Sequence, residues 1–180
     1  MTSRKIQCQS VERMFTVAQK WRRMLPVFLA VMLLLPFIVT SVYAADSPKV
    51  VEAMQELKSI TTKLGAPKLD GQDLYFGTID ISGNFAVVDS IKLKHNATAT
   101  VFAKRGDNYV RISTNVMKDG QRAVGTVLDP AGPVYPLIKQ GKSFYGEVDI
   151  LGKKYDTGYE PVKSEAGDII GVLYVGYPKD

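Results

Sequence analysis

The sequence feature that most restricts the fold of this chain is an apolar run from Leu25 to Thr40, which directly follows a basic segment. The basic segment carries six Lys and Arg residues against one acid, Glu12. Val42-Tyr43-Ala44 comes next and offers small residues where a signal peptidase cuts. Basic, apolar and small-residue regions in this order are typical of a secretory signal. We expect cleavage after Ala44, which leaves about 136 of the 180 residues for an exported domain.

An uncleaved membrane anchor is the alternative interpretation of residues 1–44. A spanning helix needs roughly 20 apolar residues, whereas this run has 16 and is interrupted by Pro26 and Pro36. The short run favours a signal peptide. Translation from Met14 or Met24 would shorten the basic segment. The sequence therefore predicts a periplasmic or extracellular protein after cleavage, or an inner-membrane protein anchored by this segment and facing the periplasm.

The net charge of +5 belongs to the N-terminal segment. Residues 1–44 hold six of the 23 basic and one of the 18 acidic residues, so 17 of each remain in the exported part. A neutral domain lacks the positive surface that nucleic acids require, and we expect no nucleic-acid partner. The only cysteine, Cys8, also lies in this segment. The exported domain therefore has neither a disulfide nor a thiolate site.

A long amphipathic helix is predicted to open the exported domain. Ser47-Pro48 is a helix-start signal, and Gly65 followed by Pro67 is a stop signal. Apolar residues between them recur at spacings of three and four, on one stripe: Val50, Val51, Met54, Leu57, Ile60 and Leu64. This stripe must dock on its own domain or on the twin helix of a second copy, which would form a homodimer.

Short β-rich runs separated by turn residues follow the helix. The clearest is a hairpin of Ala99–Lys104 and Tyr109–Thr114 around the turn 105–108. Short loops force neighbouring strands to be antiparallel. We predict an α+β fold, a long helix followed by an antiparallel sheet of five or six strands with short helices. The other predicted elements are strands at 74–79, 123–128, 144–150, 155–162 and 169–177, and helices at 85–93 and 134–140.

The exported part lacks the residues of common catalytic and metal sites. Its one histidine, His95, would have to build any His-based triad or metal site alone, and we interpret it as an exposed residue at a helix end. No phosphate-binding or dinucleotide-binding glycine motif occurs. We expect a protein that is not an enzyme and that holds no metal and no cofactor.

Arg111 is the first candidate for ligand binding. Strict alternation in Tyr109–Thr114 predicts that Tyr109, Arg111 and Ser113 share one face of the hairpin. A covered guanidinium must meet an anion, and its fork matches a carboxylate. The alternative is an arginine on a solvent-facing sheet, paired with an acid such as Asp129.

Tyrosines supply the second group of candidates. Tyr155, Thr157 and Tyr159 are predicted to share one face, with two aromatic walls and a small hydroxyl between them. Such a face suits a small-molecule pocket, although core tyrosines with satisfied hydroxyls explain it as well. Tyr145 is open to the same two interpretations.

Several segments in order resemble a known family of sensor domains. Residues 99–115, ATVFAKRGDNYVRISTN, look like the central hairpin of Cache domains. The segments RAVGT, GKSFYG, TGYEP and IGVLYVG then follow in that family's order. The chain resembles the single-Cache periplasmic parts of chemoreceptors and sensor histidine kinases, in the subgroup that fuses Cache types 3 and 2. The likeness spans about Val50–Pro178.

The resemblance implies a PAS-like sheet whose central strands and covering loops enclose a small ligand, often a short carboxylate. The domain would comprise a helical part at 45–66 and a sensor core at 67–180, behind residues 1–44. In receptors the last strand continues into a second membrane helix, whereas this sequence stops at Asp180. We therefore expect no transmembrane output from the chain itself.

These observations predict an extracytoplasmic module that binds a small, anionic ligand and passes its state to a separate receptor or kinase, as in signal transduction or chemotaxis. A helix-mediated interaction module without a ligand is the alternative. The predicted ligand-binding residues are Arg111, Ser113, Tyr145, Tyr155, Thr157 and Tyr159.

Overall fold

The computed structural model describes residues 47–179, so the predicted signal or anchor and Cys8 lie outside the described residues. Helix α2 (Pro48–Leu64) begins where predicted, with Ser47 at the N-cap, and ends at Gly65. Its apolar stripe turns inward, because Val50, Met54 and Leu57 are fully buried against the sheet. The stripe thus docks on its own domain. Within residues 47–179 we find no helix long and apolar enough to cross a membrane.

A small three-stranded antiparallel sheet follows α2, made of β1 (Pro67–Asp70), β2 (Asp73–Phe76) and β3 (Ile79–Asp80). The predicted strand at 74–79 is therefore broken, and the break is at Gly77. Gly77 has a φ of +61°, and a Cβ atom there would lie 2.2 Å from the carbonyl oxygen of Leu64. The helix end and the strand approach so closely that only glycine fits.

Helix α3 (Ala86–His95) starts one residue later and ends two residues later than predicted. The N-cap residue is Phe85, not Asn84 as the sequence predicts, although the Ala86 N–H donates to Asn84 Oδ1 at 3.1 Å. Asn96 adopts the left-handed conformation that ends the helix.

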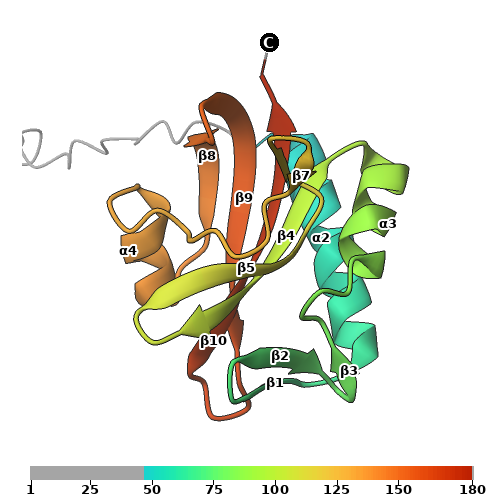
Figure 1. Cartoon of the computed structure of the whole chain (residues 1–180), viewed down its shortest axis with the longest axis vertical. Coiled ribbons are helices and arrows are strands. Elements are labelled where there is room, and N and C mark those ends of the chain that lie inside the picture. Colours follow the sequence, from blue (N-terminus) through green and yellow to red (C-terminus); the bar gives the residue numbers. More distant parts are fainter. Residues whose placement is uncertain (1–46, 180) are drawn as a thin grey trace, which may run out of the picture. The chain divides into compact units, whose positions relative to one another are not determined.

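The central sheet has five antiparallel strands in the order β5-β4-β10-β9-β8, which confirms the predicted α+β class. Its last strand in sequence, β10, lies between β4 and β9 and joins the hairpin to the C-terminal strands (Figure 1). The strands are β4 (Thr98–Arg105), β5 (Asn108–Thr114), β8 (Phe144–Ile150), β9 (Lys153–Lys163) and β10 (Ile169–Pro178).

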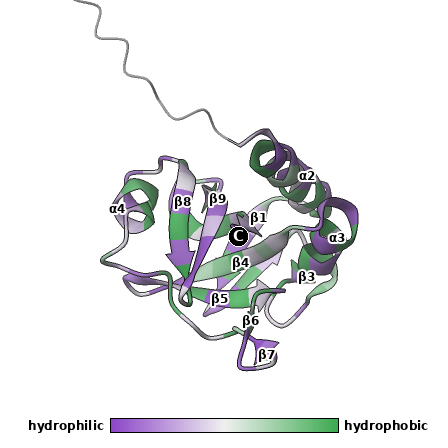
Figure 2. Ribbon diagram, turned by 90° about the horizontal axis from the view of Figure 1, so that it is seen from above, coloured by the Kyte–Doolittle hydropathy of each residue, from purple (hydrophilic) through white to green (hydrophobic). Residues whose placement is uncertain are grey.

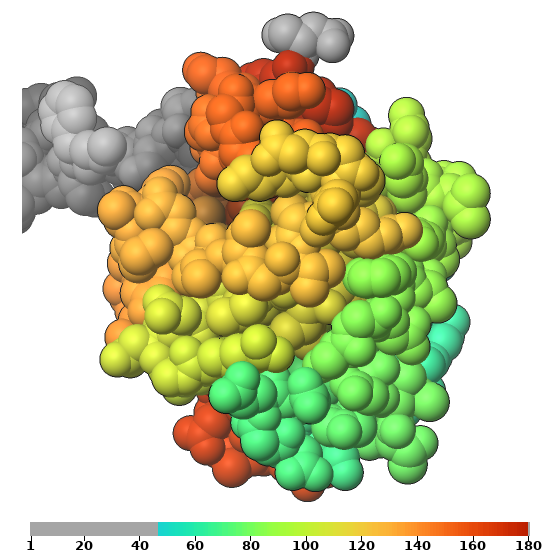
Figure 3. Space-filling model, viewed as in Figure 1, coloured from blue at the N-terminus to red at the C-terminus, as the bar shows by residue number. Residues whose placement is uncertain are grey.

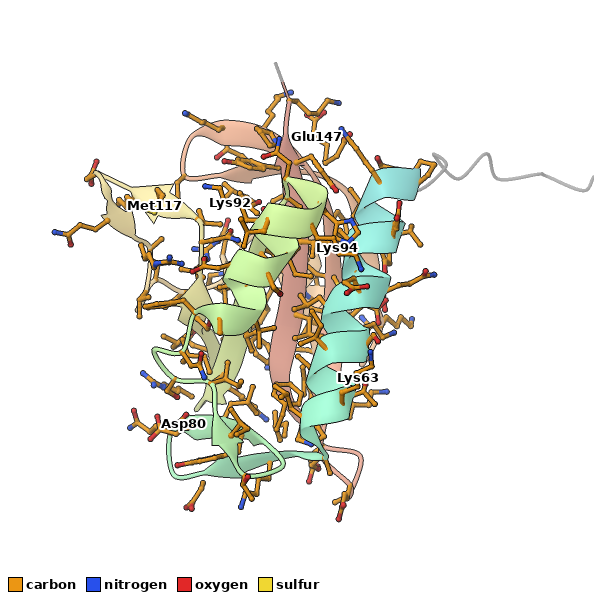
Figure 4. The ribbon with its side chains drawn as sticks, turned by 90° about the vertical axis from the view of Figure 1, so that its right-hand side faces the viewer. Lys63, Asp80, Lys92, Lys94, Met117 and Glu147 are labelled. Atoms are coloured by element: carbon orange, nitrogen blue, oxygen red, sulfur yellow. The ribbon has the colours of Figure 1, made fainter. Side chains whose placement is uncertain are left out.

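The two faces of this sheet have different covers. Helices α2 and α3 lie side by side over one face, which we call the helix face (Figures 2 and 4). Residues 115–133, here the cover segment, and helix α4 (Val134–Lys139) pack on the other, the cover face. The regular structure in the cover segment is one short hairpin of two strands with two residues each, β6 (Met117–Lys118) and β7 (Gln121–Arg122). Figure 3 shows it spread across the front of the sheet.

The predicted strand at 123–128 is not a strand of the sheet. It runs along the outer edge of β5, where Val127 forms a single antiparallel bridge with Val110. The Arg111 N–H donates to the Thr126 carbonyl and the Leu128 N–H to the Tyr109 carbonyl, both at 2.9 Å. The cover segment thereby closes an edge that would otherwise expose unpaired backbone groups.

Candidate functional site

Arg111 lies in the middle of β5 and points into the cover face. Only 5% of the residue is exposed. Its Nη1 donates to Thr126 Oγ1 at 2.6 Å, and its Cζ lies 5.1 Å from the centre of the Phe102 ring. Its Nε is buried and has no hydrogen-bond partner among the described residues. The predicted alternative, a surface arginine paired with Asp129, is therefore wrong for this residue.

No carboxylate lies beside the Arg111 guanidinium within residues 47–179: none of their ion pairs includes it. The ionisable groups that act on its charge are the phenols of Tyr159 and Tyr174. Burial lowers the pKa of Arg111 from its usual value. An arginine nevertheless stays protonated in proteins. The cover face therefore contains a buried positive charge without a protein counter-charge.

Two paired tyrosines form the wall next to this charge. Tyr159 of β9 and Tyr174 of β10 are register partners, and their ring centres are 4.9 Å apart. Both are almost fully buried, and burial raises the pKa of each phenol. Phe144 extends the wall, with its ring centre 6.2 Å from that of Tyr159. Neutral hydroxyls and aromatic rings therefore surround Arg111.

Thr157 and Tyr155 continue the same face of β9, as alternation predicts. Tyr155 and Tyr159 both pack in the cover-face core. Thr157 is 2% exposed, and its hydroxyl donates to the Gly146 carbonyl at 2.7 Å. The prediction that Tyr155, Thr157 and Tyr159 share one face is confirmed.

Ser113 does not lie with Arg111, so the predicted alternation on β5 is wrong at this point. A β-bulge at Ile112 pairs Arg111 with Phe102 but Ser113 with Val101, and these two β4 residues point to opposite faces. Ser113 is thereby turned to the helix face. Its hydroxyl donates to the Asn84 carbonyl at 2.6 Å, just before α3.

Tyr145 also lies on the helix face, where it packs against the core beneath α2. Its hydroxyl donates to Glu160 Oε1 at 2.6 Å, and Glu160 pairs with Lys58 of α2. The structure thus places four of the six predicted residues on the cover face, Arg111, Tyr155, Thr157 and Tyr159, and of these Tyr159 acts directly on the Arg111 charge. It places Ser113 and Tyr145 on the helix face.

Three residues of the cluster are not among the predicted ligand-binding residues: Phe102, Thr126 and Tyr174. Phe102 is the cross-strand partner of Arg111, but this pairing can be predicted only when the position of the bulge is known. The place of Tyr174 beside Tyr159 follows only from the pairing of β10 with β9. Nothing in the local sequence marks Thr126, which contacts Arg111 because the cover segment follows the β5 edge.

Two other features lie away from this cluster. A surface hollow of about 280 Å³ at the C-terminal end of α2 includes none of these residues, and its lining includes Lys58, Thr62, Phe76 and Leu173. His95 is half-buried, not exposed as predicted, and its Nε2 has no hydrogen-bond partner among the described residues. Within residues 47–179 no group of three or more His, Cys, Asp or Glu side chains is placed to hold a metal.

A five-stranded antiparallel sheet with a long helix on one face and a polar, loop-covered cluster on the other is a PAS-like sensor architecture. Residues 8–180 match the Cache 3/Cache 2 fusion domain, and the chain belongs to that family. Cache domains are extracytoplasmic, signal-sensing and non-enzymatic domains that bind small-molecule ligands.

The crystal structure of the E. coli DcuS sensor domain is among the solved structures similar to this chain. It has 17% sequence identity and a TM-score of 0.39, and the match covers 73% of this chain and 77% of that one. No curated protein matches this chain.

Proposed function

We propose that this domain binds a small carboxylate between the sheet and the cover segment, with Arg111 as the group that holds the anion. The observation that carries the proposal is the buried Arg111 guanidinium without a carboxylate beside it among the described residues. An unpaired buried charge is costly, and an anionic ligand removes that cost. Arg111, Tyr155, Thr157 and Tyr159 form the proposed site, together with Phe102, Thr126 and Tyr174.

Ligand entry requires the cover segment to lift from the sheet. The edge of β5 holds it through backbone hydrogen bonds at Tyr109 and Arg111. Arg122 adds a bidentate ion pair with Asp89 of α3, at 2.8 and 2.9 Å. We expect this irregular segment to open at a lower free energy than the packed helices on the opposite face.

The role of the whole chain follows from this binding activity. We propose that residues 1–44 direct export to the periplasm, as a cleaved signal or an anchor, and that 45–66 and 67–180 form the helix and core of the sensor. The domain acts by binding and not by catalysis, and it reports its ligand state to a separate receptor or kinase.

Isothermal titration calorimetry of the purified protein with short carboxylates tests the proposal. We expect Arg111→Ala to weaken binding by more than about 1 kcal/mol, as expected for the loss of a charge-assisted contact. Arg105→Ala is the matched control, because Arg105 lies in the turn of the same hairpin and is one-third exposed. Absence of heat with every carboxylate, or equal affinity in the Arg111 variant, would refute the proposal.

A further inference from the structure

Charged groups are scarce on the cover face, and this scarcity bears on the ligand. Arg111 is the one charged side chain that is buried there among the described residues. Lys104 of β4 is exposed, and Lys139 of α4 is half-exposed and pairs with Asp107. The other buried side chains of this face are uncharged: Thr100, Phe102, Tyr109, Thr114, Ile150, Thr157, Tyr159, Val172 and Tyr174 from the sheet, and Val116, Ala123, Leu128, Val134 and Ile138 from the cover segment and α4.

The orientation of the guanidinium limits how many anionic groups it can hold. One N–H of its Nη1 donates to Thr126 Oγ1. Nε has no partner among the described residues, and no hydrogen bond to them involves Nη2. Nε and Nη2 form the side edge of the guanidinium, which presents two parallel N–H groups. Such an edge accepts one carboxylate in a bidentate arrangement.

The walls of the cluster determine what the remainder of the ligand can be. Phe102, Phe144, Tyr159 and Tyr174 provide aromatic surface beside the guanidinium. A second carboxylate buried against these rings would have no cation to pair with, and a buried ammonium would have no carboxylate. Either unpaired charge carries a large desolvation cost.

We infer that the Arg111 site selects small monocarboxylates with an apolar body, and discriminates against dicarboxylates and α-amino acids. This inference rests on the proposed function, since it specifies the ligand of the same site. One guanidinium edge neutralises one carboxylate, and the aromatic wall contacts the apolar remainder. Selectivity arises because each competing ligand carries a charge that the site leaves unpaired.

A size-matched ligand series tests the inference by calorimetry on the full protein. Butyrate, succinate, 2-aminobutyrate and butyramide all have four carbons and differ in charge. Propionate, malonate, alanine and propionamide repeat the comparison with three carbons. In the size class that binds, we expect the monocarboxylate to bind at least about tenfold more tightly than the other three. Succinate or 2-aminobutyrate with equal or higher affinity would overturn the inference.

Variants separate failure of the inference from failure of the proposed function. Arg111→Ala should remove binding of the monocarboxylate, whereas Lys104→Ala should leave its affinity unchanged. If succinate binds more tightly and depends on both Arg111 and Lys104, the inference is wrong although the site is correct. If no member of either series binds, or if binding is independent of Arg111, the proposed function itself is wrong.

Discussion

The two faces of the central sheet are covered in different ways. Two regular helices cover the helix face, where the buried Asn115 accepts from the Ala99 N–H at 2.7 Å and donates to the Val88 carbonyl at 2.6 Å, although His95 Nε2 at the end of α3 has no partner among the described residues. An irregular segment covers the other face, and Arg111 Nε stays unpaired there. The difference indicates that the helix face provides stability, while the cover face gives up some stability to keep a charge available for binding.

The largest effect is expected from a cavity on the helix face. Leu57 of α2 is fully buried, so Leu57→Ala should lower the free energy of unfolding by about 3 kcal/mol. Urea denaturation measures this loss, and carboxylate affinity should be unchanged under native conditions. Leu93→Ala is the control, because Leu93 of α3 is 89% exposed and its truncation should cost less than about 0.5 kcal/mol. A parallel loss of affinity in Leu57→Ala would show that the two faces are not separable.

On the cover face, we expect a substitution of the buried charge to raise the free energy of unfolding. Arg111→Met replaces a buried, unpaired charge with an apolar side chain of similar length, so we expect the free energy of unfolding to rise by about 1 kcal/mol without carboxylate. With ligand at 100 times its Kd, the wild type should be more stable than Arg111→Met, because only the wild type gains about 2.7 kcal/mol from binding. Denaturation curves with and without ligand measure both values. A destabilised Arg111→Met variant would mean that the charge is already balanced within the protein.

A smaller effect is expected where the cover segment is attached to α3. Arg122 pairs with Asp89 and donates to the Thr114 carbonyl at 2.8 Å. Arg122→Ala should therefore cost about 1 kcal/mol or less, since the pair is partly exposed. Hydrogen exchange should become faster at the amides of Gly125 and Leu128 and stay the same in α2. Lys58→Ala removes an ion pair on the helix face and is the control; faster exchange in the cover segment of that variant would contradict the assignment.

The smallest effect concerns a surface ion pair at the end of the sheet. Lys154 and Lys179 donate to Glu147, at 2.8 and 2.7 Å, and these hydrogen bonds lower the pKa of Glu147 from 4.5 to about 2. A carboxyl group with a lowered pKa stabilises the fold above pH 4.5, and this contribution disappears as the pH falls toward 2. The difference in free energy of unfolding between the wild type and Glu147→Gln, measured by denaturation, should therefore shrink as the pH falls from 4.5 toward 2. Glu165→Gln, at an exposed acid without an ion pair among the described residues, should show no such dependence.

Local sequence signals predicted most of the elements. The three-and-four spacing of α2 and the turn chemistry of the β4–β5 hairpin led to correct elements, because both patterns depend on neighbours a few residues apart. The broken strand at Gly77 was missed, since the break is caused by Leu64 of α2. The edge segment 123–128 was predicted as a strand because its composition suits one, although it makes a single bridge.

The candidate site was predicted less completely. Arg111 was found because a lone arginine among β-forming residues needs an anion once it is buried. Ser113 was assigned to the wrong face, whereas Tyr145, for which a pocket role and a core role both stayed open, packs against the core beneath α2. Ser113 is displaced by the bulge at Ile112, whereas Tyr145 faces α2 because of the register between β8 and β9, which pairs it with Gly158.

The sequence alone determined the neutral composition of residues 45–180, the long helix, the hairpin and the presence of a single arginine at the centre of a strand. These properties follow from residue type and short-range periodicity. Only the tertiary structure decided that β10 lies between β4 and β9, that a bulge turns Arg111 and Ser113 to opposite faces, and that Thr126 contacts the guanidinium. Strand register and bulges depend on pairing between segments distant in the chain, and side-chain alternation within one strand carries no information about that pairing.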